Sequence, residues 1–345
     1  MIKPYKHINS KFHNIQSFVN HLFLDVVFRA PYIPNTAFDI SLVLAKYQRL
    51  INEVNDEYLL NPITECFAIC KTLSKKHLKT LKRGVHQNNK IRLLCNGDLT
   101  PLEYSDIAFI NEDLSKQIKI FFDKLYDEAV NKAVFYHRYG KIEDYYKNLV
   151  GKSRTCRCCG INKVLIKFHS KRSALDHYLP RNHFPFTSIN TNNLLPICDI
   201  CNSKYKLAEN TIFEVIKRNN RIVSKTRKQA FFPFSKISPY PKIDVEITLN
   251  KALSDDIEPS NMHVNLISAG YEERLETWDR LFGIKENYLA ECCSEEMYMY
   301  YEEQYMADMN FGKTHEQYVA TLEANRLYDM NFLRIAYLNG IKNYQ

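Results

Sequence analysis

The chain has few of the residues that interrupt helices. Its 345 residues include only 9 glycines and 12 prolines, whereas hydrophobic residues make up 45% and aromatic residues 13%. This composition excludes a disordered or collagen-like chain and favours a mostly helical protein with few tight turns. At this length we expect two or three domains, each able to bury a core.

The sequence also lacks a long apolar run. No stretch approaches the roughly 20 apolar residues that span a bilayer, and Asp25 interrupts the most apolar early segment, residues 21–28. The N-terminus has no apolar core of signal-peptide length. We therefore expect a soluble, cytoplasmic protein with no membrane partner. In that reducing setting its ten cysteines are expected to be metal ligands or buried small residues rather than disulfides.

The net charge gives a weak indication of the kind of partner. A formal net charge of +8 points weakly to an anionic partner, so the position of the basic residues matters more. One patch has no acidic residue in it and is predicted to contact a nucleic-acid backbone; it consists of Lys217, Arg218, Arg221, Lys225, Arg227 and Lys228. The chain shows no internal repeat and no low-complexity tract.

Three regions can be distinguished along the chain. Residues 1–150 are predicted to be helical, with the clearest helix beginning at Asn111, a plausible N-cap. Apolar residues follow it at spacings of three and four, which predicts one face of a long helix: Leu114, Ile118, Phe121, Leu125, Ala129, Ala133 and Tyr136. Residues 151–212 form a small module rich in potential ligands.

Residues 213–345 are predicted to be a second helical region that begins with the basic patch and a linker at residues 231–241. An apolar face from Tyr271 to Phe282 predicts a helix that ends at Gly283. A capping box of Thr314 and Gln317 is expected to open the last helix. The fold class is therefore α+β and mostly α-helical, with the small module flanked by helical regions.

Two Cys-x-x-Cys pairs enclose most of the central module. Cys156 and Cys159 form the first pair and Cys198 and Cys201 the second. Four thiolates complete a tetrahedral coordination sphere, so this pattern predicts a structural zinc with no open position for substrate. The pairs are further apart than in a compact zinc ribbon, which leaves room for a functional unit between them. Cys158, inside the first pair, is interpreted as a spacer.

The segment between the pairs resembles the HNH nuclease family. The matching stretches are CRCCG from Cys156, LDHYLP from Leu175 and NNLLPICDICNSK, which ends at Lys204. They occur in the family's order and near its spacing, and they cover only this part of the chain. The resemblance implies a fold of two strands and a helix that holds one divalent ion.

The resemblance also implies roles for four residues. Asp176 and Asn202 would be metal ligands, His177 would be the general base, and Asn193 would fix the loop and orient the histidine. An isolated Asp-His pair is more typical of a protein surface. Together with the four cysteines and both asparagines, however, the pair favours an active site.

The chemistry of phosphodiester hydrolysis suits these residue types. A histidine with an unperturbed pKa near 6.5 can accept the proton of an attacking water at pH 7. Mg²⁺ or Mn²⁺ accepts carboxylate and amide oxygens as ligands and offsets the charge that builds on the phosphate. Neighbouring residues of a strand point to opposite faces, so the strand should end or bulge at His177 if both residues serve one site. Pro180 is well placed to stop it.

The segment departs from the family in two places. Residues 181–187 replace a glycine pair that many relatives carry after the proline, and Tyr205 stands where a lysine is common. We expect Arg181, Lys204 and Lys206 to contact phosphate instead.

These features predict an HNH endonuclease, a hydrolase that cuts DNA. The resemblance extends to HNH proteins that act beside an ATPase in bacterial defence against phage. The chain has no P-loop, so such an ATPase would be a separate partner protein. Two alternatives stay open: a zinc-stabilised DNA-binding or scaffold module without catalysis, and an RNA-cutting toxin.

Overall fold

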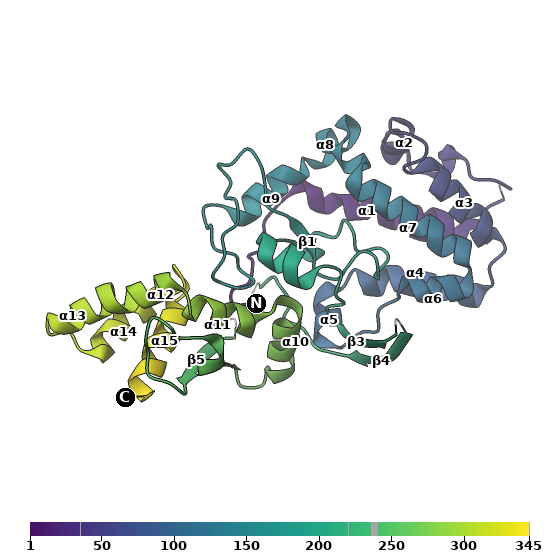
Figure 1. Cartoon of the computed structure of the whole chain (residues 1–345). Coiled ribbons are helices and arrows are strands. Elements are labelled where there is room, and N and C mark those ends of the chain that lie inside the picture. Colours follow the sequence, from purple (N-terminus) through teal and green to yellow (C-terminus); the bar gives the residue numbers. More distant parts are fainter. Residues whose placement is uncertain (35, 220, 236–240, 345) are drawn as a thin grey trace.

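The computed structural model describes residues 1–34, 36–219, 221–235 and 241–344. The described part of the N-terminal region is built almost entirely from helices (Figure 1). Its α-helices are α1 (Ile15–Asn20), α2 (Ala45–Asn52), α3 (Leu60–Lys71), α4 (Lys75–Asn88), α5 (Ile91–Asn96), α6 (Tyr104–Ile110), α7 (Glu112–Asp127), α8 (Ala133–Tyr139) and α9 (Ile142–Val150). Shorter 3-10 or π segments are η1 (Lys11–Asn14), η2 (His21–Val26), η3 (Val27–Tyr32), η4 (Ile40–Leu42) and η5 (Ala129–Asn131).

Helix α7 begins as the sequence predicts but ends earlier. The Asn111 side chain accepts a hydrogen bond from the Leu114 amide, which confirms the N-cap. The apolar stripe is buried from Leu114 to Ala129, but the helix stops at Asp127 and a new one, α8, starts at Ala133. Ala133 is exposed, so the prediction of one continuous helix was wrong beyond α7.

The central module contains two short strands and a π-helical turn. Strand β1 (Leu175–His177) pairs antiparallel with β2 (Leu194–Pro196), so that Asp176 lies opposite Leu195. A 3-10 turn, η6 (Thr191–Asn193), leads into β2. The π-helical segment η7 (Ile200–Lys206) begins inside the second cysteine pair and contains Cys201.

The basic patch lies on a β-hairpin, not on a helix or in a linker. Strands β3 (Phe213–Arg218) and β4 (Arg221–Arg227) pair antiparallel, with a register shift after Ile216. Each strand carries two adjacent β-branched residues, Val215 and Ile216 on β3 and Ile222 and Val223 on β4, and such residues suit an extended backbone. Of the expected linker, residues 236–240 lie outside the described part of the chain.

The C-terminal region combines a second hairpin with helices. Strands β5 (Asp244–Leu249) and β6 (Met262–Ile267) pair antiparallel, joined by η8 (Pro259–Asn261). The helices are α10 (Glu272–Phe282), α11 (Ile284–Cys292), α12 (Glu295–Met299), π segment η9 (Tyr300–Tyr305), α13 (Met306–Asn310), α14 (His315–Glu323) and α15 (Asn331–Tyr344). Gly283 ends α10 in a left-handed conformation, as predicted. The capping box of Thr314 and Gln317 opens α14, so its assignment to the last helix was wrong.

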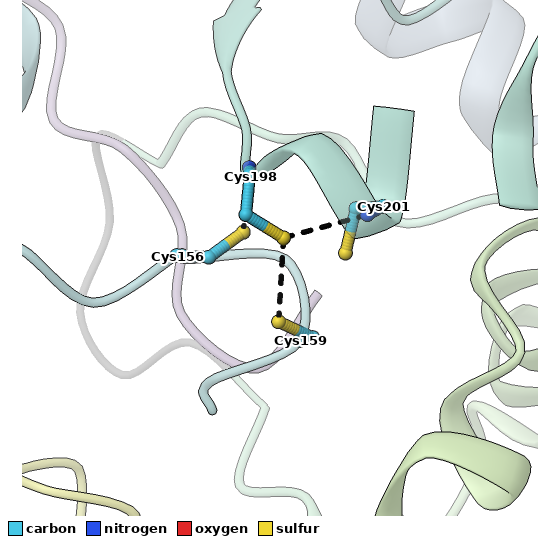
Figure 2. Close-up of side chains that lie close together, drawn as sticks. All are labelled: Cys156, Cys159, Cys198 and Cys201. Atoms are coloured by element: carbon cyan, nitrogen blue, oxygen red, sulfur yellow. Dashed lines mark hydrogen bonds between the residues drawn. The ribbon is translucent and has the colours of Figure 1, made fainter. Parts of the chain in front are cut away.

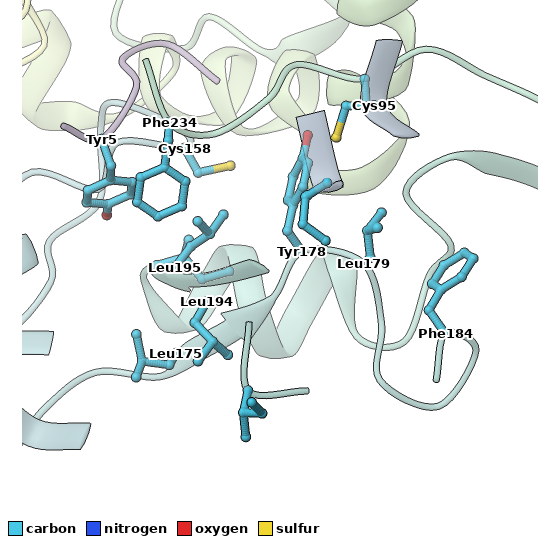
Figure 3. Packing of buried hydrophobic residues seen from close by; sticks show 14 of the residues in the cluster. Tyr5, Cys95, Cys158, Leu175, Tyr178, Leu179, Phe184, Leu194, Leu195 and Phe234 are labelled. Atoms are coloured by element: carbon cyan, nitrogen blue, oxygen red, sulfur yellow. The ribbon is translucent and has the colours of Figure 1, made fainter. Parts of the chain in front are cut away.

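Buried hydrophobic residues of all three regions join in one continuous core. Leu175, Leu194 and Leu195 of the strands lie in this core (Figure 3). Phe186 anchors the loop after β1 to the N-terminal helices. Its ring packs edge-on against Phe23, 5.5 Å away, and against Phe122, also 5.5 Å away. The flanking helices therefore form part of the support of the central module. In the described parts of the chain, no helix has the length and apolarity that a membrane span requires.

Candidate metal and active site

The four cysteines of the two pairs converge on one buried point (Figure 2). Their sulfur atoms all lie within 4.8 Å of one another, and the Sγ atoms of Cys159 and Cys198 are 4.0 Å apart. In a tetrahedral zinc site with Zn–S bonds of about 2.3 Å, sulfur atoms are about 3.8 Å apart. The cluster is therefore consistent with a structural zinc. All ten cysteines lie in described residues and are free thiols.

The environment of these thiols requires a cation if they are to ionise together. Burial raises the pKa of the Cys156 thiol, while hydrogen bonds from Cys156, Cys198 and Cys201 lower the pKa of the Cys159 thiol. Several thiolates so close together in a dry site would repel one another strongly without a metal. Cys158 is also buried but lies outside the group of four, as the interpretation as a spacer predicts.

The C-terminal region covers this cluster. The Tyr288 hydroxyl of α11 donates a hydrogen bond of 2.7 Å to the carbonyl of Cys159. Gly160 has a φ of +82°, and a Cβ there would come within 2.8 Å of the Phe332 ring of α15. A glycine is therefore required both by the backbone conformation and by the close approach of α15.

A cleft of about 410 Å³ lies beside the cysteine cluster. Strand β1 ends at His177, as predicted, and both Asp176 and His177 line the cleft. Asn202 lines it from η7, and Arg181 from the loop after Pro180. The fold thus brings together three of the four residues that the sequence assigns to the site.

Asp176 is only half satisfied. Its Oδ1 accepts a hydrogen bond of 2.8 Å from the Lys206 ammonium, and both side chains are almost fully buried. Its Oδ2 is buried and has no hydrogen-bond partner within the described structure. Burial raises the pKa of Asp176, while the Lys206 charge opposes that shift. An orphaned carboxylate oxygen in a cleft is the kind of atom that a bound cation would satisfy.

Lys206 is buried, whereas the prediction that it contacts phosphate requires it to lie on the surface. Its ammonium also donates to the carbonyl of His177 at 2.9 Å, and its side chain is 1% exposed. The prediction that Lys206 contacts phosphate is therefore wrong for this conformation. The π-helical turn explains the change, because the Leu207 amide bonds to the Asn202 carbonyl, five residues back, and so one extra residue is accommodated in the turn.

His177 is held as a neutral imidazole with one defined tautomer. Its Nε2 lies 2.9 Å from the Ser188 carbonyl, which can only accept, so Nε2 carries the proton and Nδ1 keeps a lone pair. The Tyr126 ring of α7 packs against the imidazole at 4.5 Å. Burial, with the charges of Arg181 and Lys206, lowers the pKa of His177 to about 3. The unprotonated Nδ1 can accept a proton, but a pKa this far below 7 makes the imidazole a weaker base than an unperturbed histidine.

Asn193 does not line the cleft but holds the loop around it. It is fully buried; its Oδ1 accepts from the Leu179 amide at 2.7 Å, and its Nδ2 donates to the Leu179 carbonyl at 2.9 Å and to the Thr187 carbonyl at 3.3 Å. Thr187 precedes the Ser188 carbonyl that orients His177. This arrangement fits a positioning residue.

The remaining basic residues are divided between structure and surface. Arg181 forms an ion pair with Asp127 at 2.9 Å and lies over the Tyr126 ring, so α7 partly neutralises it. Lys225 pairs with Glu103, Lys228 with Glu214 at 3.4 Å, and Arg227 donates to backbone carbonyls, including that of Ile212 at 2.7 Å. Lys204, Lys217, Arg218 and Arg221 are exposed and form no ion pair with a described residue, whereas the exposed Lys225 is paired.

Asp176 and Asn202 line the same cleft. The buried Asp176 Oδ2 has no partner among the described residues, and the Asn202 Nδ2 donates to the Ser203 hydroxyl at 3.3 Å. Carboxylate and amide oxygens are ligand types that hard cations prefer. Sequence reasoning missed Lys206, Tyr126 and Ser188 as neighbours of the two key side chains. From the sequence, only the spacing of four residues between Asn202 and Lys206 could have indicated that Lys206 lies on the same helical face as Asn202.

Comparison with known proteins adds no relative to this geometry. No family model, no curated protein and no solved structure matches the chain.

Proposed function

We propose that the chain is a metal-dependent endonuclease of the HNH type. The observation that carries this proposal is the convergence of Asp176, His177 and Asn202 on one cleft, with an unpartnered Asp176 oxygen and an unprotonated His177 Nδ1. The four-cysteine cluster, proposed to bind Zn²⁺, supports the segment that presents Asn202, because Asn202 directly follows Cys201.

In the proposed reaction His177 takes the proton of an attacking water on Nδ1. The Ser188 carbonyl stabilises the imidazolium that forms, because Nε2 already donates to it. Asp176 and Asn202 would hold a Mg²⁺ or Mn²⁺ ion, which when bound supplies electrostatic stabilisation of the charge that develops on the phosphate and on the leaving oxygen. Asn193 keeps the loop in place during this proton transfer.

DNA is the proposed substrate, and the exposed cations at the end of the β3–β4 hairpin are proposed to contact its backbone. The sequence resemblance supports a setting in bacterial defence against phage, in the cytoplasm, beside a separate ATPase. An RNA substrate uses the same chemistry and is the alternative within this proposal.

One observation favours a second candidate, a zinc-stabilised binding or scaffold module without catalysis. The Lys206 ammonium already bonds to Asp176 Oδ1, and a fixed cation beside the carboxylate opposes the binding of a second one. The unpartnered Oδ2 favours the nuclease over this candidate.

Nicking of supercoiled plasmid by the purified protein tests the nuclease, with Mg²⁺, with Mn²⁺ or with neither. We expect metal-dependent nicking by the wild type and a loss of at least about a hundredfold in His177→Ala, typical of a lost general base. His169→Ala, an exposed loop histidine outside the cleft, is the matched control and should retain full activity. Labelled RNA is the second substrate. If the wild type cuts neither the plasmid nor the RNA, the result would support the binding module.

A further inference from the structure

A second cavity, of about 720 Å³, lies apart from the cleft and shares none of its described lining residues. Helix α5, the segment that follows β4 and the start of α10 enclose it, and α5 and α10 lie side by side in Figure 1. Its volume is within the range of small-ligand sites. Nothing in the proposed nuclease chemistry uses it.

Flat rings form one wall of this cavity. The rings of His7 and Phe234 stack with centroids 5.0 Å apart, and Phe232 lies beside both. Phe231 and Tyr271 stack at 6.0 Å. All five line the cavity, and Phe232 is half-exposed. Such a wall suits a planar heteroaromatic ring.

The described residues that line the cavity carry positive charge and no negative charge. Lys90, Arg92 and Arg274 line it, and no described lining residue is acidic. Lys90 and Arg92 are exposed and have no ion-pair partner among the described residues. Among the described residues the Arg274 guanidinium contacts neutral groups: it bonds to the Gln229 side chain at 3.2 Å and the Asn96 side chain at 3.3 Å, and it lies over the Tyr271 ring. Three cations without a carboxylate favour an anionic ligand.

We propose that this cavity binds a phosphorylated nucleoside. Its base would lie against the ring of Phe232, and its phosphates would contact Lys90, Arg92 and Arg274. The half-buried Asn192 amide lines the same cavity and can donate to or accept from a base edge. The ligand is either a free nucleotide or one nucleotide of a single strand. This inference goes beyond the proposed function and does not rest on it.

The cavity touches the turn that supports the cleft. Asn190 Nδ2 donates to the carbonyl and the side chain of Asn89, at 3.1 and 2.9 Å, and Asn89 lines the cavity. Asn192 lies between Asn190 and the positioning residue Asn193. Bound nucleotide is therefore expected to slow hydrogen exchange of the amides at residues 190–193.

Isothermal titration calorimetry of the full chain tests the site. The probes are ATP and pentathymidylate, titrated without added divalent metal into His177→Ala protein, which prevents cleavage of the oligonucleotide. We expect saturable binding of at least one probe, weakened about tenfold or more by Arg92→Glu and by Phe232→Ala. Lys76→Glu makes the same charge change on an exposed face of α4 and should alter the Kd less than about twofold.

The two probes separate the two sources of ligand. Binding of ATP alone indicates a free nucleotide, and binding of pentathymidylate alone indicates a strand. The absence of heat from both probes up to about 1 mM would overturn the proposal. Binding that survives both substitutions, in variants whose thermal unfolding matches the wild type, would overturn it as well. None of these outcomes depends on whether the protein cuts DNA.

Discussion

The four-cysteine cluster and the cleft beside it differ in how far the chain satisfies their polar groups. The cluster has four buried sulfur atoms, three from loops and one from η7, and Tyr288 of α11 bonds to the carbonyl of Cys159. In the cleft, one Asp176 oxygen is bonded to Lys206 and the other has no partner among the described residues. In the proposed function this is the difference between a structural metal site with no open position and a reactive site that keeps one.

Loss of a cysteine ligand should have the largest effect. Cys198→Ser removes one of four ligands from a site that the core surrounds, so we expect loss of the bound zinc and a fall of roughly 5 kcal/mol or more in the free energy of unfolding. Elemental analysis measures the zinc content, and chemical denaturation measures the free energy of unfolding. Cys293→Ser, at a half-buried cysteine outside the cluster, is the control and should retain the zinc. A zinc-free wild type of equal stability would contradict the structural role.

Phe186→Ala should have the next largest effect on stability. The side chain is fully buried against Phe23 and Phe122, so the cavity left behind should cost about 3 kcal/mol. Because Phe186 anchors the loop of the open site, activity should fall while the zinc content stays at the wild-type level. Phe168→Ala, which removes a 70% exposed ring, should change the stability by less than about 0.5 kcal/mol. Equal effects of the two substitutions would show that the loop is not anchored this way.

Lys206→Met tests the half-satisfied carboxylate. It leaves both oxygens of buried Asp176 without a cation, so we expect a loss of about 3 kcal/mol without added metal. Saturating Mn²⁺ should recover more of the free energy of unfolding in this variant than in the wild type, since the ion no longer competes with the ammonium. Lys204→Met, at an exposed lysine two residues away, should behave as wild type. If Mn²⁺ fails to stabilise Lys206→Met, Asp176 does not hold a metal.

The smallest predicted effect is the pH dependence that His177 contributes. Its pKa is about 3 in the folded chain and about 6.5 in the unfolded chain, so protons bind first to the unfolded state as the pH falls. Its contribution to stability is complete above pH 6.5 and is lost progressively below it. Between pH 7.5 and 6 the wild type should lose up to about 0.8 kcal/mol relative to His177→Gln. If the free energy of unfolding changes with pH in the same way for the two proteins, His177 titrates normally when folded.

Local sequence signals account for part of this structure. The side chain of Asn111 caps α7, Gly283 ends α10, and β1 stops at His177, each for a reason that neighbouring residues determine. The cysteine cluster was also predictable, because the chemistry of a tetrahedral site leaves few other uses for two such pairs.

Long-range packing accounts for what the sequence did not reveal. Lys206 is expected at the surface from its residue type, yet a π-helical turn directs it to a carboxylate thirty residues earlier. Tyr126 reaches His177 from a helix fifty-one residues away along the chain. The hairpin that carries the basic patch was not predicted from the sequence, although its strands contain β-branched residues. The ion pair of Lys225 with Glu103 ties this hairpin to the N-terminal region, and that contact could not be read from the local sequence.

The most direct test of the account is Mn²⁺ binding to protein whose zinc is intact, followed by electron paramagnetic resonance. We predict one bound Mn²⁺ per chain in the wild type, unchanged affinity in His169→Ala, and an affinity at least about tenfold lower in Asp176→Asn, which keeps the side chain's shape but removes its charge. The zinc content should be the same in all three proteins. Equal Mn²⁺ binding by the wild type and Asp176→Asn, or none by the wild type, would contradict the claim that the open site holds a metal.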